Sequence, residues 1–572
     1  MRSSGTAHPV LRIGAVILAL GLFAGAAFAL TYEAQREDAE ERRDRVFATN
    51  DPVERGCSLS KEIILRTWRG YYQGRSEDVV MVPQYPNYSG TFDLVNHSGP
   101  WDYLTNVPLV LYGPEHIQAR GRVEAPASIT DVYPTAGALS EVDLPPRDGR
   151  VLVEAIKPGA ENPPKLIITV VWDGVGRNVL EEWPHAWPTL ARLEREGTSF
   201  VNASVGSSPT ITPATHSSLG TGAFPRSHGV TGIYYQKPNG KVTGAFKGRS
   251  TDDLQLTTFA DDIDPAYGNA SKVGLVASRS WHMGMLGHGS TIEGGDEDQL
   301  GIFREELVKF PTDEFSLATP GFSFPSSLTE TSWSRLDEYG DEVDRADGEA
   351  DGEWLGHPVL TGDLRDNPAW VMHETDAIIQ MMQGEGYGTD EVPDFMFTNL
   401  KMADTIGHHY LMDSREMSLI LRALDDSLRK IVAHLDREVG DYVLVLTADH
   451  GHTLPASRTG AWPVRNGVLA ENVDAHFNAP KDENIVERNV AVGLFLNQQL
   501  LREMNLTSDD VARYVNDYTI RDNWPEDELP QGYGDRGEEN VFSAAWTDST
   551  MDDVIRCAFG SGRPPKRVED SG

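Results

Sequence analysis

The sequence predicts an α/β fold, in which helices sandwich a largely parallel central sheet and a cap is inserted into the catalytic unit. Three apolar runs, at 166–172, 395–397 and 443–446, are typical of buried strands. Apolar residues at helical spacing over 417–435 and 500–515 indicate helices that cover this sheet. A carboxylate follows each apolar run. Because open α/β sheets gather their active sites at the carboxyl ends of strands, these carboxylates are the candidates for chemistry.

The first of these runs ends in the pair Asp173-Gly174. An aspartate that caps a turn is the ordinary explanation of such a pair, and it does not by itself indicate a site. A short helix is expected next, over Pro188–Glu196, because Pro188 starts it and Gly197 stops it.

A loop rich in serine and threonine follows, from Ser208 to Gly222. A hydroxyl at the start of a helix can contact a metal ion and a phosphoryl group together, because the helix N-terminus favours an anion. Metal coordination lowers the pKa of such a hydroxyl and makes it a nucleophile.

Two motifs downstream each combine a carboxylate with an imidazole. They are Asp404-Thr-Ile-Gly-His408 and Ala-Asp449-His450-Gly. Oxygen and nitrogen ligands at the ends of neighbouring strands suit two divalent metal ions of the zinc type. The sequence therefore predicts a metal-dependent hydrolase.

The order and spacing of these motifs resemble the alkaline phosphatase superfamily. The closest resemblance is to its threonine-nucleophile branch of phosphodiesterases, nucleotide pyrophosphatases and exported phosphatases. The matching pieces are VWDG at 171–174, PTITPATHSSLGTG at 209–222, PRSHG at 225–229, DTIGH at 404–408 and ADHG at 448–451. The resemblance implies an alkaline phosphatase-like fold and hydrolysis of phosphoric esters.

The resemblance also implies roles for individual residues. Thr212 matches the nucleophile. Two zinc ions are expected, and the first would be held by Asp173, Thr212, Asp449 and His450. The second would be held by Asp404, His408 and a further histidine.

Two histidines are candidates for that last ligand. His476 follows the ADHG motif too closely for this branch, although related phosphoglycerate mutases use a near histidine. His97 precedes a Val107-Pro-Leu strand segment that resembles what family members carry near their C-terminus. We therefore favour His97, and with it a circularly permuted chain in which the usual C-terminal piece precedes the first strand.

A permuted chain also has a consequence for its two cysteines. The segments near Cys57 and Cys557 would flank the ancestral joint, so a disulfide between them is expected. Permutation is tolerated where the old termini lie close together and the new break is at the surface.

The substrate is less well defined than the metal site. Ile233 takes the position of an asparagine that usually holds the phosphoryl oxygen in this branch. Arg279 and Trp281 are the candidates for substrate contacts, where exported phosphomonoesterases carry a lysine and an arginine. Because a monoester dianion needs more positive charge than a diester, we expect a phosphodiesterase. The alternatives are a phosphomonoesterase and, in another class, an envelope binding protein on the same fold.

Composition and the amino-terminal segment limit the possible partners and the location of this protein. The net charge of −37 argues against a nucleic-acid polymer as partner, but small phosphorylated substrates remain compatible. Arg2 and Arg12 precede an apolar stretch over 13–30 that is a signal peptide or a membrane anchor. The catalytic part is thus expected to be secreted, periplasmic or membrane-anchored. The expected segments are targeting 1–30, charged stalk 31–56, permuted segment 57–150, core 151–232, cap 233–390, core 391–560 and tail 561–572.

Overall fold

The computed structural model describes residues 49–159, 162–302, 319–330, 333–359 and 366–560, together with residues 47 and 564. The predicted targeting segment 1–30 lies outside the described residues, and so does nearly all of the tail 561–572. Across the described residues, no helix combines the length and apolar character needed to cross a membrane.

The described residues build a nine-stranded central sheet. From β13 to β17 all neighbouring strands are parallel, whereas β3 runs antiparallel to both of its neighbours. In order across the sheet, the strands are β13 (Phe322–Ser323), β12 (Asp298–Ile302), β11 (Val273–Ala277), β16 (Asp394–Leu400), β6 (Leu166–Trp172), β17 (Tyr442–Thr447), β3 (Leu109–Tyr112), β7 (Thr198–Phe200) and β4 (Gly121–Val123). The predicted α/β fold with a largely parallel sheet is confirmed.

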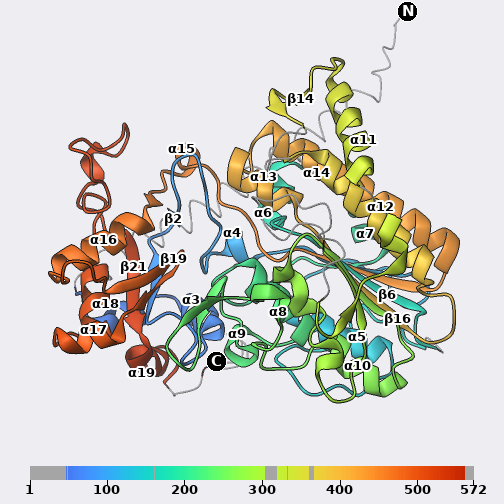
Figure 1. The fold of residues 1–572 in the computed structure, drawn as a ribbon, viewed down its shortest axis with the longest axis horizontal. Helices are drawn as coiled ribbons and strands as arrows, with labels where there is room; N and C mark the ends of the chain where they lie inside the picture. Colours follow the sequence, from blue (N-terminus) through green and yellow to red (C-terminus); the bar gives the residue numbers. More distant parts are fainter. Residues whose placement is uncertain are drawn as a thin grey trace, which may run out of the picture.

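Helices cover both faces of this sheet, and Figure 1 shows α12, α13 and α14 on one side and α5, α8 and α10 on the other. The helix α14 (Arg415–His434) begins after the Ser414 cap and buries Met417, Leu421, Leu424 and Leu428. This stripe is the periodicity seen in the sequence. The other bounds are α12 (Pro368–Glu385), α13 (Met402–Tyr410), α5 (Val132–Leu139), α8 (Thr212–Thr221), α10 (Phe259–Tyr267) and α7 (Pro188–Glu196). The last of these has the predicted bounds.

A second, antiparallel sheet joins the two ends of the described chain. Its strands are β19 (Val486–Val490), β20 (Gly493–Leu496), β1 (Val79–Pro83) and β21 (Phe542–Thr547). The early strand β1 lies between the late strands β20 and β21. Figure 1 shows the blue start and red end of the chain side by side in this unit.

The helices of this second unit complete the junction. They are α2 (Pro52–Cys57), α3 (Lys61–Gly70), α16 (Asn466–His476), α17 (Gln498–Glu503), α18 (Ser508–Asp517) and α19 (Asp548–Phe559). Cys57 and Cys557 form a disulfide across the interface of α2 and α19, with Cα atoms 5.8 Å apart.

Three expectations from the sequence need correction. The stretch 233–390 is not a separate cap, because β11, β12 and β13 belong to the central sheet. The charged stalk 31–56 overlaps α2, where buried Arg55 donates hydrogen bonds to the backbone oxygens of Asn516 and Phe542.

The helix expected over 500–515 is two helices, α17 and α18, separated near Asn505 at φ 56°. They cover the antiparallel sheet rather than the central one, since α18 packs on β21. Periodicity identified the apolar face of these helices but not the sheet that it meets.

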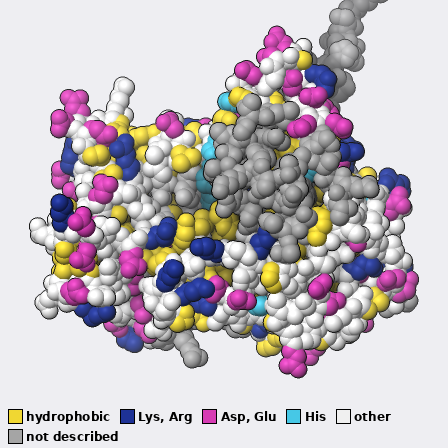
Figure 2. Space-filling view, viewed as in Figure 1, with side chains coloured by type: hydrophobic (Ala, Val, Ile, Leu, Met, Phe, Trp, Pro, Cys, Tyr) yellow, Lys and Arg dark blue, Asp and Glu magenta, His cyan; other side chains and the backbone are white. Residues whose placement is uncertain are grey.

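Acidic side chains are spread over the visible face of the molecule (Figure 2). The acidic tract 337–353 begins in α11 (Trp333–Asp344), where Leu336 and Val343 are buried. A helix tolerates this charge because its acidic face remains in solvent.

Candidate metal centre

The three parallel strands β16, β6 and β17 bring the predicted motifs to one edge of the central sheet. Their register places Leu400 beside Trp172 and Val171 beside Thr447, so the strands end together. Asp173 follows β6, Asp404 lies in α13 just after β16, and Asp449 follows β17. All three carboxylates are buried. The prediction that these motifs converge at strand ends is confirmed.

Gly174 allows these segments to approach each other. Its φ of +74° is in the left-handed region, and a Cβ there would lie 2.9 Å from Asp404 Cα. Its backbone N–H donates a hydrogen bond of 3.0 Å to Asp449 Oδ1. A glycine after the strand is therefore required by the packing of the three acidic segments.

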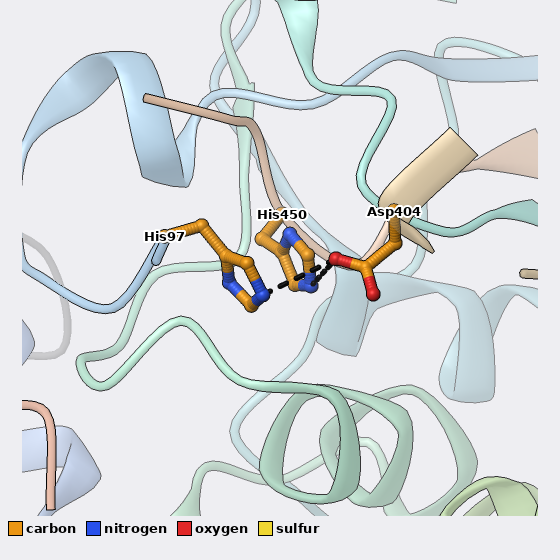
Figure 3. A group of neighbouring side chains, drawn as sticks. All are labelled: His97, Asp404 and His450. Carbon is orange, nitrogen blue, oxygen red and sulfur yellow. Dashed lines mark ion pairs between the residues drawn. The ribbon is translucent and has the colours of Figure 1, made fainter. Parts of the chain in front are cut away.

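Two groups of possible metal ligands share His450. In the first group, His450 Nε2 lies 3.2 Å from Asp449 Oδ2 and 3.7 Å from Asp173 Oδ1. In the second, His97 Nε2 lies 3.2 Å from Asp404 Oδ1, as drawn in Figure 3. The rings of His97 and His450 stack 3.5 Å apart. Nε2 of His408 approaches Asp404 Oδ1 at 3.5 Å.

His97 reaches this centre from the amino-terminal part of the chain, in the loop before α4 (Asp102–Thr105). Its Nδ1 lies 2.9 Å from the backbone oxygen of Thr210, and the Thr210 hydroxyl donates to the His97 backbone oxygen at 2.6 Å. His476 is exposed at the end of α16, with its ring 4.3 Å from that of Tyr514. The structure thus brings His97, and not His476, to Asp404.

Thr212 is the first residue of α8, and its side chain is buried. A hydroxyl in this position shares the partial positive charge of the helix N-terminus, which favours a phosphoryl group. The Nδ1 atom of His216, one turn later, lies 2.8 Å from the Thr212 backbone oxygen and holds this first turn.

Lys401 is the main site residue that the sequence reasoning missed. Its Nζ lies 2.7 Å from both Asp173 Oδ1 and Asp404 Oδ2, and it donates to Thr212 Oγ1 at 3.1 Å. Burial acts to raise the pKa of Asp404, but the Lys401 ammonium holds that pKa well below its usual range. The sequence feature that could have identified Lys401 is its position between a buried strand and the Asp404 motif.

Four other side chains complete the surroundings of the carboxylates. Asn399, at the end of β16, donates to Asp173 Oδ2 at 2.9 Å and contacts His216 Nε2 at 2.9 Å. His282 Nε2 lies 3.3 Å from Asp173 Oδ2, and His452 Nε2 lies 3.2 Å from Asp404 Oδ1. Buried polar residues at strand ends were a usable signal for Asn399, whereas only the fold brings His282 here.

Arg279 and Trp281, the predicted substrate contacts, lie next to His282 in the chain. The Arg279 guanidinium lies 5.1 Å from the ring centre of Trp281, and both residues are half-buried. The short helix η3 (Ser280–Met285) points His282, rather than Trp281, at Asp173. A substrate contact by Arg279 or Trp281 stays a prediction.

Among His97, His216, His408 and His450, three imidazoles are in the neutral form that metal binding needs, and His450 is the exception. Burial lowers the pKa of His97 to about 3 and the pKa values of His408 and His216 to about 4. They are therefore neutral, which is the form that binds metals. For His450, burial is outweighed by the charges of Asp449, Asp404 and Asp173, which raise its pKa to about 9. A bound cation would replace that proton.

The residues present fit a metal centre. Asp449 Oδ2 and His450 Nε2 are buried, and apart from their ion pair with each other at 3.2 Å neither has a hydrogen-bond partner among the described residues, as expected for ligand atoms. The buried histidines and aspartates form overlapping groups whose ligand atoms lie within 4.8 Å of one another. These groups are consistent with a bimetallic site.

Fold and site define a metal-dependent phosphoesterase of the alkaline phosphatase superfamily. The sequence model of the family described as type I phosphodiesterase / nucleotide pyrophosphatase matches residues 167–538, and the chain belongs to this family.

Two of the curated relatives that the chain matches are alkaline phosphatases. The chain is 24% identical over 415 residues to alkaline phosphatase PafA of Elizabethkingia meningoseptica, covering 64% of this chain and 74% of PafA. It is 25% identical over 340 residues to alkaline phosphatase PhoK of Sphingomonas sp, covering 54% of this chain and 59% of PhoK. A crystal structure of wild-type PafA superposes with a TM-score of 0.47 at 17% identity, covering 67% of this chain and 84% of that one.

Proposed function

We propose that this chain is an exported phosphomonoesterase that acts through Thr212 with two zinc ions. The sequence favoured a phosphodiesterase, because a cation for a dianionic substrate was missing. Lys401 supplies such a cation, since its ammonium lies 3.1 Å from Thr212 Oγ1. PafA and PhoK are both named alkaline phosphatases, which supports the same choice.

The charge of the centre suits a dianion. Three carboxylates (Asp173, Asp404 and Asp449) would be opposed by two divalent ions and by Lys401, which leaves a net positive charge. A phosphate monoester carries more negative charge than a diester and gains more from this field. In our proposal, Asp173, Thr212, Asp449 and His450 hold one ion, and Asp404, His408 and His97 hold the other.

The proposed reaction is a two-step displacement at phosphorus. The zinc ions, when bound, lower the pKa of the attacking hydroxyl and neutralise charge on the phosphoryl oxygens. Thr212 Oγ1 forms the new bond to phosphorus while the ester oxygen leaves. Lys401 stabilises the Thr212 oxygen, and the N-terminus of α8 faces the phosphoryl group. Water then cleaves the phosphothreonine and releases phosphate.

Phosphodiester hydrolysis is the second candidate. It is supported by the description of the family and by Trp281, an aromatic surface that suits an organic substituent. Hydrolysis of p-nitrophenyl phosphate and of bis-p-nitrophenyl phosphate by zinc-loaded protein distinguishes the two. We expect the larger kcat/KM with the monoester, and a larger value with the diester would contradict the proposal.

Export and permutation are further parts of the proposal. The Cys57–Cys557 disulfide fits an oxidising compartment, and the apolar segment 13–30 would direct the chain there. For the permutation, the support is that β1 pairs with β20 and β21 from the far end of the chain. A chain reopened in the loop before β6, with its present ends joined at α2 and α19, should fold and retain activity.

A further inference from the structure

A second cluster of carboxylates lies at the other edge of the central sheet. Asp298 is the first residue of β12, Asp296 precedes it by two residues, and Asp264 lies in α10. One oxygen from each lies within 4.8 Å of the others. Since Gly274 pairs with Gln299 in parallel strands, the cluster sits where β11 and β12 begin. The candidate metal centre lies where the strands end.

Two of these three carboxylates, those of Asp264 and Asp298, are buried. Asp264 is 0% exposed and Asp298 is 3% exposed. Both side-chain oxygens of Asp298 and Oδ1 of Asp264 lack a hydrogen-bond partner within the described part of the chain. Oδ2 of Asp264 accepts one hydrogen bond, from the Asp296 backbone N–H at 3.3 Å. Buried carboxylates without partners are costly, so this arrangement points to a missing cation.

The neighbouring groups add negative rather than positive charge. Asp261, one turn before Asp264 in α10, repels both buried carboxylates. Its own oxygens are occupied by the backbone N–H and Nδ1 of His288. Burial, followed by repulsion from the other aspartates, raises the pKa of Asp264 to about 7 and the pKa of Asp298 well above its usual range. No ion pair within the described residues includes Asp264, Asp296 or Asp298.

We propose that Asp264, Asp296 and Asp298 bind a calcium ion. Oxygen donors without nitrogen or sulfur select a hard cation, and calcium accepts carboxylates from flexible segments together with water. Asp296 is half-buried and gives the ion a route from solvent.

The ion would tie the loop before β12 to α10. With its side-chain amide turned so that the nitrogen faces these acceptors, Asn269 donates to the backbone oxygens of Asp264 and Gly294 at 3.2 and 3.1 Å, which links the two segments next to the carboxylates. Because the cluster lies at the amino ends of the strands, the calcium ion stabilises the fold and takes no part in the reaction.

The test adds calcium chloride to full-length protein that is already saturated with zinc. Calorimetric titration is expected to show one calcium equivalent, and the thermal midpoint should rise by about 3–6 °C. Asp298→Asn and Asp296→Asn should each reduce that rise to under about 1 °C, while zinc content and hydrolysis of p-nitrophenyl phosphate stay unchanged. Asp296 is only half-buried, so its variant tests the site with little risk to folding.

A matched control separates this site from general binding to an acidic surface. Glu338→Gln with Glu342→Gln removes two charges from the exposed face of α11 and should leave the calcium response intact. A wild-type protein that takes up no calcium overturns the proposal. So does a calcium response that survives in both aspartate variants. Loss of phosphatase activity in all proteins would instead contradict the proposed function.

Discussion

The central sheet carries a cluster of aspartates at each edge, and the two clusters differ in their partners. At the carboxyl edge, Asp173 and Asp404 both contact Lys401 at 2.7 Å, and neutral imidazoles complete the surroundings. At the amino edge, Asp264 and Asp298 lie beside a third carboxylate, that of Asp296, and none of the three is in an ion pair with another described residue. Nitrogen ligands and a fixed cation suit zinc and phosphoryl transfer, whereas oxygen alone suits a hard structural ion.

The proposed nucleophile, Thr212, provides the strongest test of the catalytic edge. Thr212→Ala in zinc-loaded protein should lower kcat for p-nitrophenyl phosphate by at least about 10³-fold, because no oxygen remains to attack phosphorus. Thr212→Ser keeps the hydroxyl and should retain most activity. Zinc content measured in parallel checks that the centre is still formed. Near-normal rates in the alanine variant would exclude a phosphothreonine.

Lys401→Met removes the cation that distinguishes the two edges. We expect kcat for the monoester to fall about 10²–10³-fold, since a charged donor next to Thr212 is lost. The diester, with less charge to stabilise, should lose less. Lys165→Met is the control, because among the described residues Lys165 forms its ion pair with the exposed Glu391. An equal loss of kcat for both substrates would mean that Lys401 does not contribute to the preference for the more highly charged monoester.

His97 and His476 form a matched pair for the second metal group. His97→Ala should lower zinc affinity by more than about 10-fold, since even residues that only support a ligand have effects of that size. His476→Ala should change neither zinc content nor rate, because its ring contacts Tyr514 in the other unit. Equilibrium dialysis against zinc measures both. The opposite pattern would overturn the assignment of His97.

Glu77 and Asp78, just before β1, form a third acidic group, and no ion is proposed there. They show how burial changes the pKa of a carboxyl group. Burial raises the pKa of Glu77 to about 7 and the pKa of Asp78 to about 6. At pH values between the usual carboxyl pKa and these raised pKa values, the folded state binds more protons than the unfolded state. The free energy of unfolding of this unit therefore falls as pH rises from about 4.5 to 7.

Glu77→Gln should flatten that pH dependence. The variant is expected to gain about 1–2 kcal/mol over wild type at pH 8 and little at pH 4.5, measured by urea denaturation of metal-free protein. Glu503→Gln, at an exposed position in α17, is the control. A pH dependence that is the same in all three proteins would assign it to other groups.

Local patterns predicted the part of the site that is local. Asp173, Asp404 and Asp449 each follow an apolar run, and parallel strands of similar length bring such residues to one edge. Helix bounds at Pro188–Glu196 followed from Pro188 and Gly197, because these residues act through their own backbone. The nucleophile position of Thr212 came from its motif.

Tertiary structure alone decided the rest. The sequence places Lys401 three residues before Asp404, but it does not show that the ammonium also contacts Asp173 after β6 and Thr212 at the start of α8, because these segments are far apart along the chain. The predicted cap over 233–390 failed for the same reason, since strand length and apolar content do not reveal which sheet a strand joins. The sequence by itself determined the chemistry of each strand end, and the fold decided which charges meet, because electrostatic contacts depend on distance in space and not along the chain.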